Sequence, residues 1–231
     1  MVIAHVYVVF HRRLPQSVGQ QTRIIAHLRM PENIKKLTPR RRPKQGRSRD
    51  TVEAILTASQ QILLRNGLKG FNTNVVAKRA GVSVGSLYQF FPGKEAILAA
   101  LVRDMRRDML ADLIAAQQAS NAGDLADVIG AMIDASLKHH LRAPELTATL
   151  EQAEAQLPMD AETQALKSNM FQLVLGVLQR HAIEDPETVT QDVIAMCHGM
   201  VDAAISAGER DFDEISSRLR RATINYISAT N

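Results

Sequence analysis

The chain has 231 residues, which is enough for one large domain or two small ones. Its 45% hydrophobic and 23% charged residues are typical of a globular protein and exclude a wholly disordered chain. The only cysteine, Cys197, excludes an intramolecular disulfide and any site built from several thiolates, and it favours a reducing compartment. The net charge of +4 is uneven, because residues 1–49 hold 12 Lys and Arg against one acid, while the remainder holds 16 against 23.

Residues 1–46 are predicted to form a basic, disordered N-terminal extension, because they lack sustained helical periodicity and end in a run rich in Pro and Arg. A basic segment ahead of an acidic body indicates an end that faces nucleic acid, although a solvated tail has the same composition. The segment is either a natural arm or the result of a start codon assigned too far upstream. No stretch approaches the ~20 apolar residues of a membrane span, so we expect a cytoplasmic protein without a membrane partner.

Helical periodicity begins at Arg49 and continues to Asn66-Gly67, a pair that is typical of a left-handed helix stop. Further helices are predicted at 94–118, 124–141, 144–156, 159–182, 187–207 and 212–229. Apolar residues surround the helix at 159–182, so it is predicted to be central. No segment shows sustained period-two alternation, and the predicted fold class is therefore all-α.

Residues 72–91 read as two short helices joined by a tight turn. Thr73 can cap the first helix, Gly81 allows the sharp reversal, and Ser83 can cap the second. This order is typical of a helix-turn-helix, although in isolation the same pattern also serves as plain packing. The shared core is predicted to contain Val76, Ala77, Ala80, Val82, Leu87 and Phe91. The residues left to face outward are Ser83, Val84, Gly85, Ser86, Tyr88 and Gln89.

Motifs at fixed spacing run through residues 49–107. They are Asn66-Gly67 at the end of the first helix, Phe71-Asn-Thr, Val76-Ala77, Ala80-Gly-Val-Ser-Val-Gly-Ser-Leu-Tyr88 and Phe91-Pro-Gly-Lys-Glu-Ala-Ile-Leu98. With these motifs the segment resembles the DNA-binding domain of the TetR family of bacterial transcriptional regulators. Its departures are small, since Asn72 stands where the family usually has Thr, and Val76 where Ile or Leu is usual.

The resemblance implies an all-α architecture in two parts. An N-terminal three-helix helix-turn-helix DNA-binding domain, residues 47–107, would be followed by a larger helical ligand-binding and dimerisation domain, residues 108–231. The implied DNA-binding residues are Thr73, Asn74, Ser83, Val84, Gly85, Ser86, Tyr88, Gln89 and Lys94. Among them the family pattern places Val84, Gly85, Ser86 and Gln89 at the major groove, and Thr73, Tyr88 and Lys94 at phosphates. The physics agrees, because a Gln side chain can pair bidentately with adenine and a lysine at a helix start attracts phosphate.

The last two helices are predicted to form the interface of a homodimer. The helix from 187 has an apolar face wider than the core of one protomer needs, and apolar residues of the last helix recur with the 3-4 spacing of a coiled-coil seam. The alternative is that both faces are satisfied within one chain. The resemblance, in which the last two helices dimerise, favours the interface residues Val193, Cys197, Val201, Ile215, Leu219, Ala222 and Tyr226.

Family analogy also places a small-molecule pocket between the helices of the body. The implied function is a ligand-responsive repressor that binds a palindromic operator on double-stranded DNA as a homodimer and is released by a small-molecule effector. The predicted pocket residues are Met132, Leu137, His140, Met170, Phe171, Val174 and Met200. Methionines suit a broad apolar ligand because they repack readily, but Met and Phe at helical spacing are also common in a plain core.

No catalytic, metal or cofactor site is predicted. His139 and His140 are adjacent, so they point ~100° apart on a helix and cannot share a metal ion as residues four apart would. Cys197 and His198 fail as a nucleophile and base for the same reason. Charged residues expected away from the apolar faces of their helices are Arg103, Asp104, Arg106, Arg107 and Asp108, and Glu151 and Glu154 are expected on a solvated face. The alternative function is an all-helical small-molecule-binding protein or enzyme in which the helix-turn-helix is only structural.

Overall fold

The computed structural model describes residues 37, 46–158 and 160–230. Most of the predicted N-terminal extension, residues 1–46, therefore lies outside the described residues. Where the chain is described it is helical and contains no strand, which confirms the predicted all-α class. The first helix begins at Gly46, slightly ahead of the periodic pattern that starts at Arg49.

The helical elements follow one another with short connections. They are α3 (Gly46–Asn66), the 3-10 turn η2 (Leu68–Gly70), α4 (Thr73–Ala80), α5 (Val84–Phe90), α6 (Lys94–Ala119), α7 (Leu125–Arg142), α8 (Pro144–Gln156), α9 (Ala161–Arg180), α10 (Pro186–Ser206) and α11 (Phe212–Ala229). The helix α9 is shorter than the predicted 159–182, because Asp160 caps its start and Ala182 takes a left-handed backbone conformation just beyond its end.

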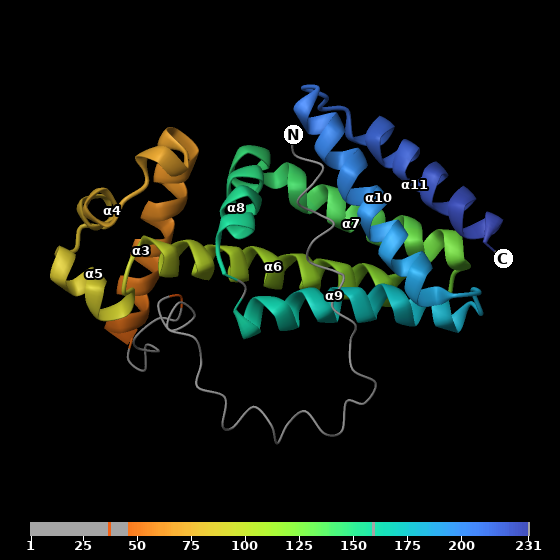
Figure 1. Cartoon of the computed structure of the whole chain (residues 1–231), viewed down its shortest axis with the longest axis horizontal. Helices are drawn as coiled ribbons and strands as arrows, with labels where there is room; N and C mark the ends of the chain where they lie inside the picture. The colour runs from red at the N-terminus through yellow and green to blue at the C-terminus, as the bar shows by residue number, and fades with distance from the viewer. Residues whose placement is uncertain (1–36, 38–45, 159, 231) are drawn as a thin grey trace, which may run out of the picture.

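The helix α6 connects the two parts of the molecule. In Figure 1, α3, α4 and α5 gather at one end of α6. The helices α7, α8 and α9 pack along its remainder, and α10 and α11 pack on α9 and α7. Seven apolar residues of α6 between Ala96 and Met105 belong to one hydrophobic core, which they share with α3, α4, α5 and α8. Met109 and Leu113 belong to a second core in the body. The prediction that 159–182 is the central helix is therefore wrong, since α9 is only half-buried around Met170 and Phe171 and α6 takes the central position.

The last two helices pack into the core of their own protomer. Val193 and Val201 of α10, and Ile215 and Leu219 of α11, are buried. The helix α11 lies against α7 and α10. The 3-4 spacing of α11 therefore marks a seam within the chain. In the protomer these four side chains are covered by their own chain, and their place in a subunit interface stays a prediction.

Two buried arginines fix α6 to the body. Arg103 and Arg106 are each only 5% exposed, so their position away from the apolar face of α6 does not expose either of them. Nη1 of Arg103 donates to Oδ2 of Asp160 at 2.8 Å. The Asp160 carboxylate also caps α9 by accepting from the backbone N–H groups of Glu162 and Thr163. Removing one member of such a pair leaves an uncompensated buried charge, so this contact ties α6 firmly to the start of α9.

Arg106 joins α6 to α8. Its Nη2 lies 2.6 Å from Oε2 of Glu154 and 3.6 Å from Oε1 of Glu151. Nζ of Lys167, on α9, lies 3.1 Å from the other Glu154 oxygen. Both glutamates are largely buried, which corrects the prediction of a solvated face; their three-residue spacing places them on the same side of α8, where they face Arg106.

His140 of α7 completes what we call the charged cluster: Arg106, His140, Glu151, Glu154 and Lys167. Nδ1 of His140 lies 3.0 Å from the carbonyl oxygen of Ser136, which can only accept, so Nδ1 carries a proton. Nε2 lies 3.3 Å from Oε1 of Glu151. Burial alone would lower the pKa of His140, but the hydrogen bond and negative charge of Glu151 outweigh it and raise the pKa above 6.5. Burial would likewise raise the pKa of Glu151, yet its cationic neighbours, His140 above all, lower it to about 2.

We expect Leu219→Ala to lower the free energy of unfolding by about 2–5 kcal/mol, because Leu219 is 1% exposed and its truncation leaves a cavity. Chemical denaturation measures this change. Ser217→Ala, at an exposed position of the same helix, is the control and should change stability by less than about 0.5 kcal/mol. If Leu219→Ala unfolded like wild type but no longer bound a second subunit, Leu219 would belong to the subunit interface instead of the core of the protomer.

We also expect His140 to make stability depend on pH. Because its folded-state pKa is raised, its pairing with Glu151 contributes fully below pH 6.5, and the contribution is lost as the pH rises through the folded-state pKa. The difference in unfolding free energy between wild type and His140→Gln should be widest near about pH 6 and shrink toward about pH 9. Urea unfolding of both proteins across this range measures it, and a constant difference would mean that His140 does not gain a proton on folding.

Candidate DNA-binding site

The helices α4 and α5 form a helix-turn-helix. Between them Gly81 takes a left-handed backbone conformation with φ of 68°, which favours glycine because it has no Cβ. The predicted core is confirmed: Val76, Ala77, Leu87 and Phe91 are buried, and Ala80 and Val82 are half-buried. The two short helices are therefore held at a fixed angle by side chains that they share.

Asn72, rather than the predicted Thr73, caps α4. Oδ1 of Asn72 accepts hydrogen bonds from the backbone N–H groups of Asn74 and Val75 at 3.1 and 3.0 Å. Thr73 is the first residue of the helix, so its hydroxyl is not needed at the cap. It lies instead 3.1 Å from the hydroxyl of Tyr88 and thereby links the start of α4 to α5.

Ser83 caps α5 as predicted. Its Oγ accepts from the backbone N–H of Ser86 at 3.0 Å and lies 2.8 Å from the Ser86 hydroxyl. The two serines thus form hydrogen bonds with each other at the start of the recognition helix. Their hydroxyls shape the helix, which leaves fewer free polar groups on its surface.

The predicted DNA-binding residues lie together on this unit. Asn74, Ser83, Val84, Gly85, Tyr88, Gln89 and Lys94 are exposed, and Thr73 and Ser86 are half-buried. Sequence reasoning missed Val75, which is also exposed. Val75 directly precedes the buried Val76, and in the helix the two side chains point to different sides.

The electrostatic character of this surface is positive. Residues 72–94 contain the basic residues Lys78, Arg79 and Lys94 and no acidic residue, and all three are exposed. Lys94 is the first residue of α6, so its ammonium group adds to the positive end of that helix. Such a surface attracts the phosphates of a nucleic acid.

The predicted effector residues line neither of the two cavities described for this part of the chain. Met132, Leu137 and His140 are buried, while Met170, Phe171, Val174 and Met200 are half-buried. None of the seven lines the small cavity beside α6 or the open depression of about 380 Å³ between α3 and α4. In the described conformation these side chains pack mainly against one another and their neighbours.

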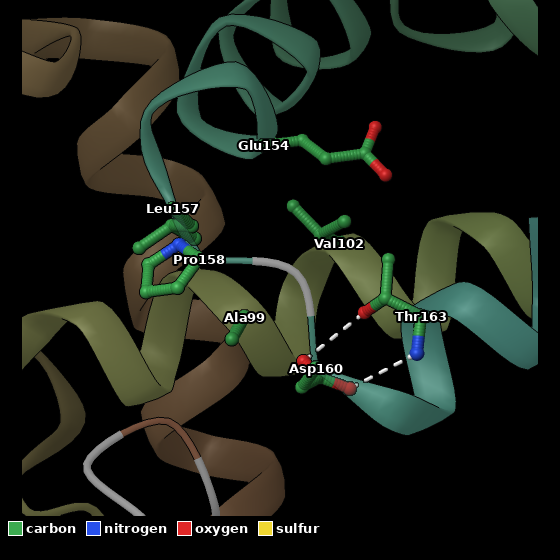
Figure 2. Close-up of a pocket in the computed structure, with 7 residues that line it drawn as sticks. All are labelled: Ala99, Val102, Glu154, Leu157, Pro158, Asp160 and Thr163. Atoms are coloured by element: carbon green, nitrogen blue, oxygen red, sulfur yellow. Dashed lines mark hydrogen bonds between the residues drawn. The ribbon is translucent and has the colours of Figure 1, made fainter. Parts of the chain in front are cut away.

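Figure 2 shows the small cavity, which lies where α6, the end of α8 and the start of α9 meet. Ala99 and Val102 come from α6, and Asp160 and Thr163, which are hydrogen-bonded to each other, come from the start of α9. Its volume of about 20 Å³ suffices for about one water molecule and is far below that of a small-molecule site.

Three predicted interface residues, Cys197, Ala222 and Tyr226, are half-buried and so keep part of their surface. The Tyr226 hydroxyl donates to the carboxylate of Asp192, and this hydrogen bond raises the pKa of Tyr226. Burial raises the pKa of the Cys197 thiol, which makes it a poor nucleophile. These residues therefore contribute packing and hydrogen bonding to α10 and α11.

The histidines offer no metal site in the part of the chain that the structure describes, where no group of three or more His, Cys, Asp or Glu could hold a metal ion. The rings of His140 and His198 meet edge to face with centroids 6.1 Å apart. The side chain of His139 lies outside the described residues. No helix among those described is both long and apolar enough to cross a membrane.

Similarity to known protein families covers both parts of the molecule. Residues 55–101 match the family described as bacterial regulatory proteins, tetR family, and residues 124–227 match the tetracyclin repressor-like C-terminal domain. The HTH-type transcriptional regulator BetI of Rhizobium meliloti (strain 1021) is 25% identical over 166 residues, which cover 68% of this chain and 79% of that protein. BetI of Vibrio vulnificus (strain YJ016) is 30% identical over 70 residues, or 30% of this chain and 35% of that protein.

Solved structures share the fold at lower sequence identity. A putative transcriptional regulator from Pseudomonas aeruginosa PAO1 has a TM-score of 0.63 and 20% identity, over 82% of this chain and 93% of that chain. The fatty acid degradation regulator FadR from Bacillus halodurans has a TM-score of 0.63 and 16% identity, over 79% and 96%. With a helix-turn-helix of the expected geometry and family matches on both sides of α6, the chain belongs to the TetR family and is a transcriptional regulator with a helix-turn-helix DNA-binding domain.

Proposed function

We propose that this regulator is a ligand-responsive repressor that binds a palindromic operator as a homodimer and leaves it when a small molecule binds the body. The observation that carries the proposal is that α6 belongs to two hydrophobic cores, so a rearrangement of the body reaches the DNA-binding unit through one continuous helix. We assign DNA binding to residues 47–107 and ligand binding and dimerisation to residues 108–231. A protein that acts on the chromosome in this way works in the cytoplasm.

The outward side of α10 is the proposed contact with a second copy. Ala195, Gly199 and Ala203 recur there at four-residue intervals, and all three are exposed in the protomer. A Cβ at Gly199 would meet nothing within 4 Å, so packing of the protomer does not require glycine there. Small side chains let a partner helix approach closely. A two-fold contact would present two recognition helices to half-sites ~34 Å, or a multiple of that distance, apart.

The effector is proposed to enter among α6, α7, α9 and α10. Its proposed contacts are Met132, Leu137, His140, Met170, Phe171, Val174 and Met200. Because these residues are packed in the described conformation, a ligand must favour a second conformation in which the helices lie farther apart. Linkage then requires that effector and operator weaken the binding of each other by the same factor.

We expect Ala203→Glu to convert the dimer into monomers, because it would place a charge in a close helix contact while leaving the core of the protomer untouched. Light scattering should give the monomer mass, and operator affinity should fall by more than about tenfold as the two half-sites become independent. Ala126→Glu makes the same change at an exposed position of α7 and is the control, with dimer and affinity retained. A dimeric Ala203→Glu protein would place the interface elsewhere.

Selection from random-sequence duplexes tests the operator assignment, and the enriched site should be a palindrome. Within it, Gln89→Ala should cost about 1–3 kcal/mol of base discrimination at one position in each half-site, because its amide can pair with adenine. Tyr88→Phe is the comparison, since loss of a phosphate contact lowers affinity evenly for all sequences. An even loss for Gln89→Ala would make Gln89 a backbone contact, and failure to enrich any sequence would favour a structural role for the helix-turn-helix.

A further inference from the structure

Most polar side chains of the recognition helix α5 are already engaged within the protein. The hydroxyls of Ser83 and Ser86 lie 2.8 Å apart, and Ser83 also accepts the backbone N–H of Ser86. The hydroxyl of Tyr88 lies 3.1 Å from that of Thr73. Apart from Gln89, the exposed surface at this end of α5 is therefore apolar side chain and bare backbone.

Val84 supplies the apolar side chain. It is 38% exposed, and the helix-turn-helix, residues 72–91, holds three of the five large hydrophobic residues that are exposed in the described chain: Val75, Val84 and Tyr88. The exposed part of the Val84 side chain adds nothing to the stability of its own protomer, because burial of apolar surface is what stabilises a fold. Its exposure here is best explained by an apolar group on the binding partner.

At Gly85 the backbone of α5 is exposed and carries no side chain. This glycine lies inside α5 with no left-handed conformation that would demand glycine. A Cβ built there would meet only Oγ of Ser83, at an ordinary contact distance of 3.8 Å. Gly130 is different, because a Cβ there would lie 2.2 Å from Nη1 of Arg220. Packing of this chain therefore explains the glycine at 130 but not the glycine at 85, which lies exposed on the surface of the helix-turn-helix.

We propose that Val84 and the backbone of Gly85 together form the contact surface for the C5-methyl group of a thymine in the major groove. This inference rests on the proposed operator binding and names the base that one part of the site selects. The thymine methyl is the only apolar group on a major-groove base edge, so it matches an exposed valine. Without a Cβ at residue 85, the base edge can approach the helix backbone directly.

The first experiment removes the methyl group from the DNA. In the operator enriched by the full-length protein, each thymine is replaced in turn by deoxyuracil, which lacks only that methyl. One position per half-site should lose affinity by about fourfold, the value of one buried CH₂ group. In Val84→Ala the same replacement should cost less than about twofold, because the partner of the methyl is gone. Equal tolerance of uracil at every position, or an undiminished loss in Val84→Ala, would overturn the proposal.

The second experiment adds a methyl group to the protein. Gly85→Ala should unfold at the same temperature as wild type or higher, since alanine favours a helix, yet bind the operator at least about tenfold more weakly. Gly176→Ala is the matched control: this glycine lies inside α9, a Cβ there meets nothing within 4 Å, and operator affinity should not change.

The two proposals fail in different ways. Unchanged operator affinity in Gly85→Ala would overturn the thymine contact while leaving operator binding intact. If the wild-type protein enriched no sequence at all, the proposed function would fall and the thymine contact with it.

Discussion

The constraint on which the rest of the structure depends is the pairing of two buried arginines on α6 with carboxylates of the body. Arg103 is held by Asp160 at the start of α9, and Arg106 by Glu154 and Glu151 of α8. Buried ion pairs do not weaken gradually, because a displaced arginine leaves two uncompensated charges in a medium of low polarity. These pairs therefore hold the connecting helix in one position relative to α8 and α9.

Several polar side chains of the DNA-binding unit form hydrogen bonds within the protein. Asn72 and Ser83 cap helices, and the pair of Thr73 and Tyr88 joins α4 to α5. These polar groups are able to form hydrogen bonds with bases, but here they keep the two short helices rigid. What remains for recognition is a small set of side chains with fixed positions, and a surface that is already ordered gives up little conformational entropy when it binds.

Local signals account for the parts of the fold that could be predicted. Glycine at 67 and 81, prolines ahead of α8 and α10, and helical periodicity are properties of neighbouring residues, and they located the helices to within a few positions. The position of the helix-turn-helix and its core followed from the same kind of signal. Only the choice between Asn72 and Thr73 as the cap was wrong, since both residue types can cap and the two are adjacent.

Sequence patterns could not decide which apolar or charged helix face packs against which neighbour. Leu219 and Ile215 show a seam spacing that is identical for a partner helix and for α7 of the same chain, so periodicity could not separate the two. Arg106 lies 45 or more positions along the chain from either Glu151 or Glu154. The burial of these charges depends on three helices meeting. Pairing over such separations is a property of tertiary structure and leaves no mark in local patterns.

Because α6 is long, a small tilt where it joins the body moves its other end by a larger distance. A helix of 26 residues is ~39 Å long, so a tilt of only about 5° at the body end carries the other end through about 3 Å. That distance is close to the ~3.4 Å step between successive bases along a DNA strand. A rearrangement around the body end of α6 small enough to be absorbed by side-chain movements would thus shift a recognition helix by one base step. In the proposed homodimer, two such shifts would put both recognition helices out of phase with the turn of the double helix.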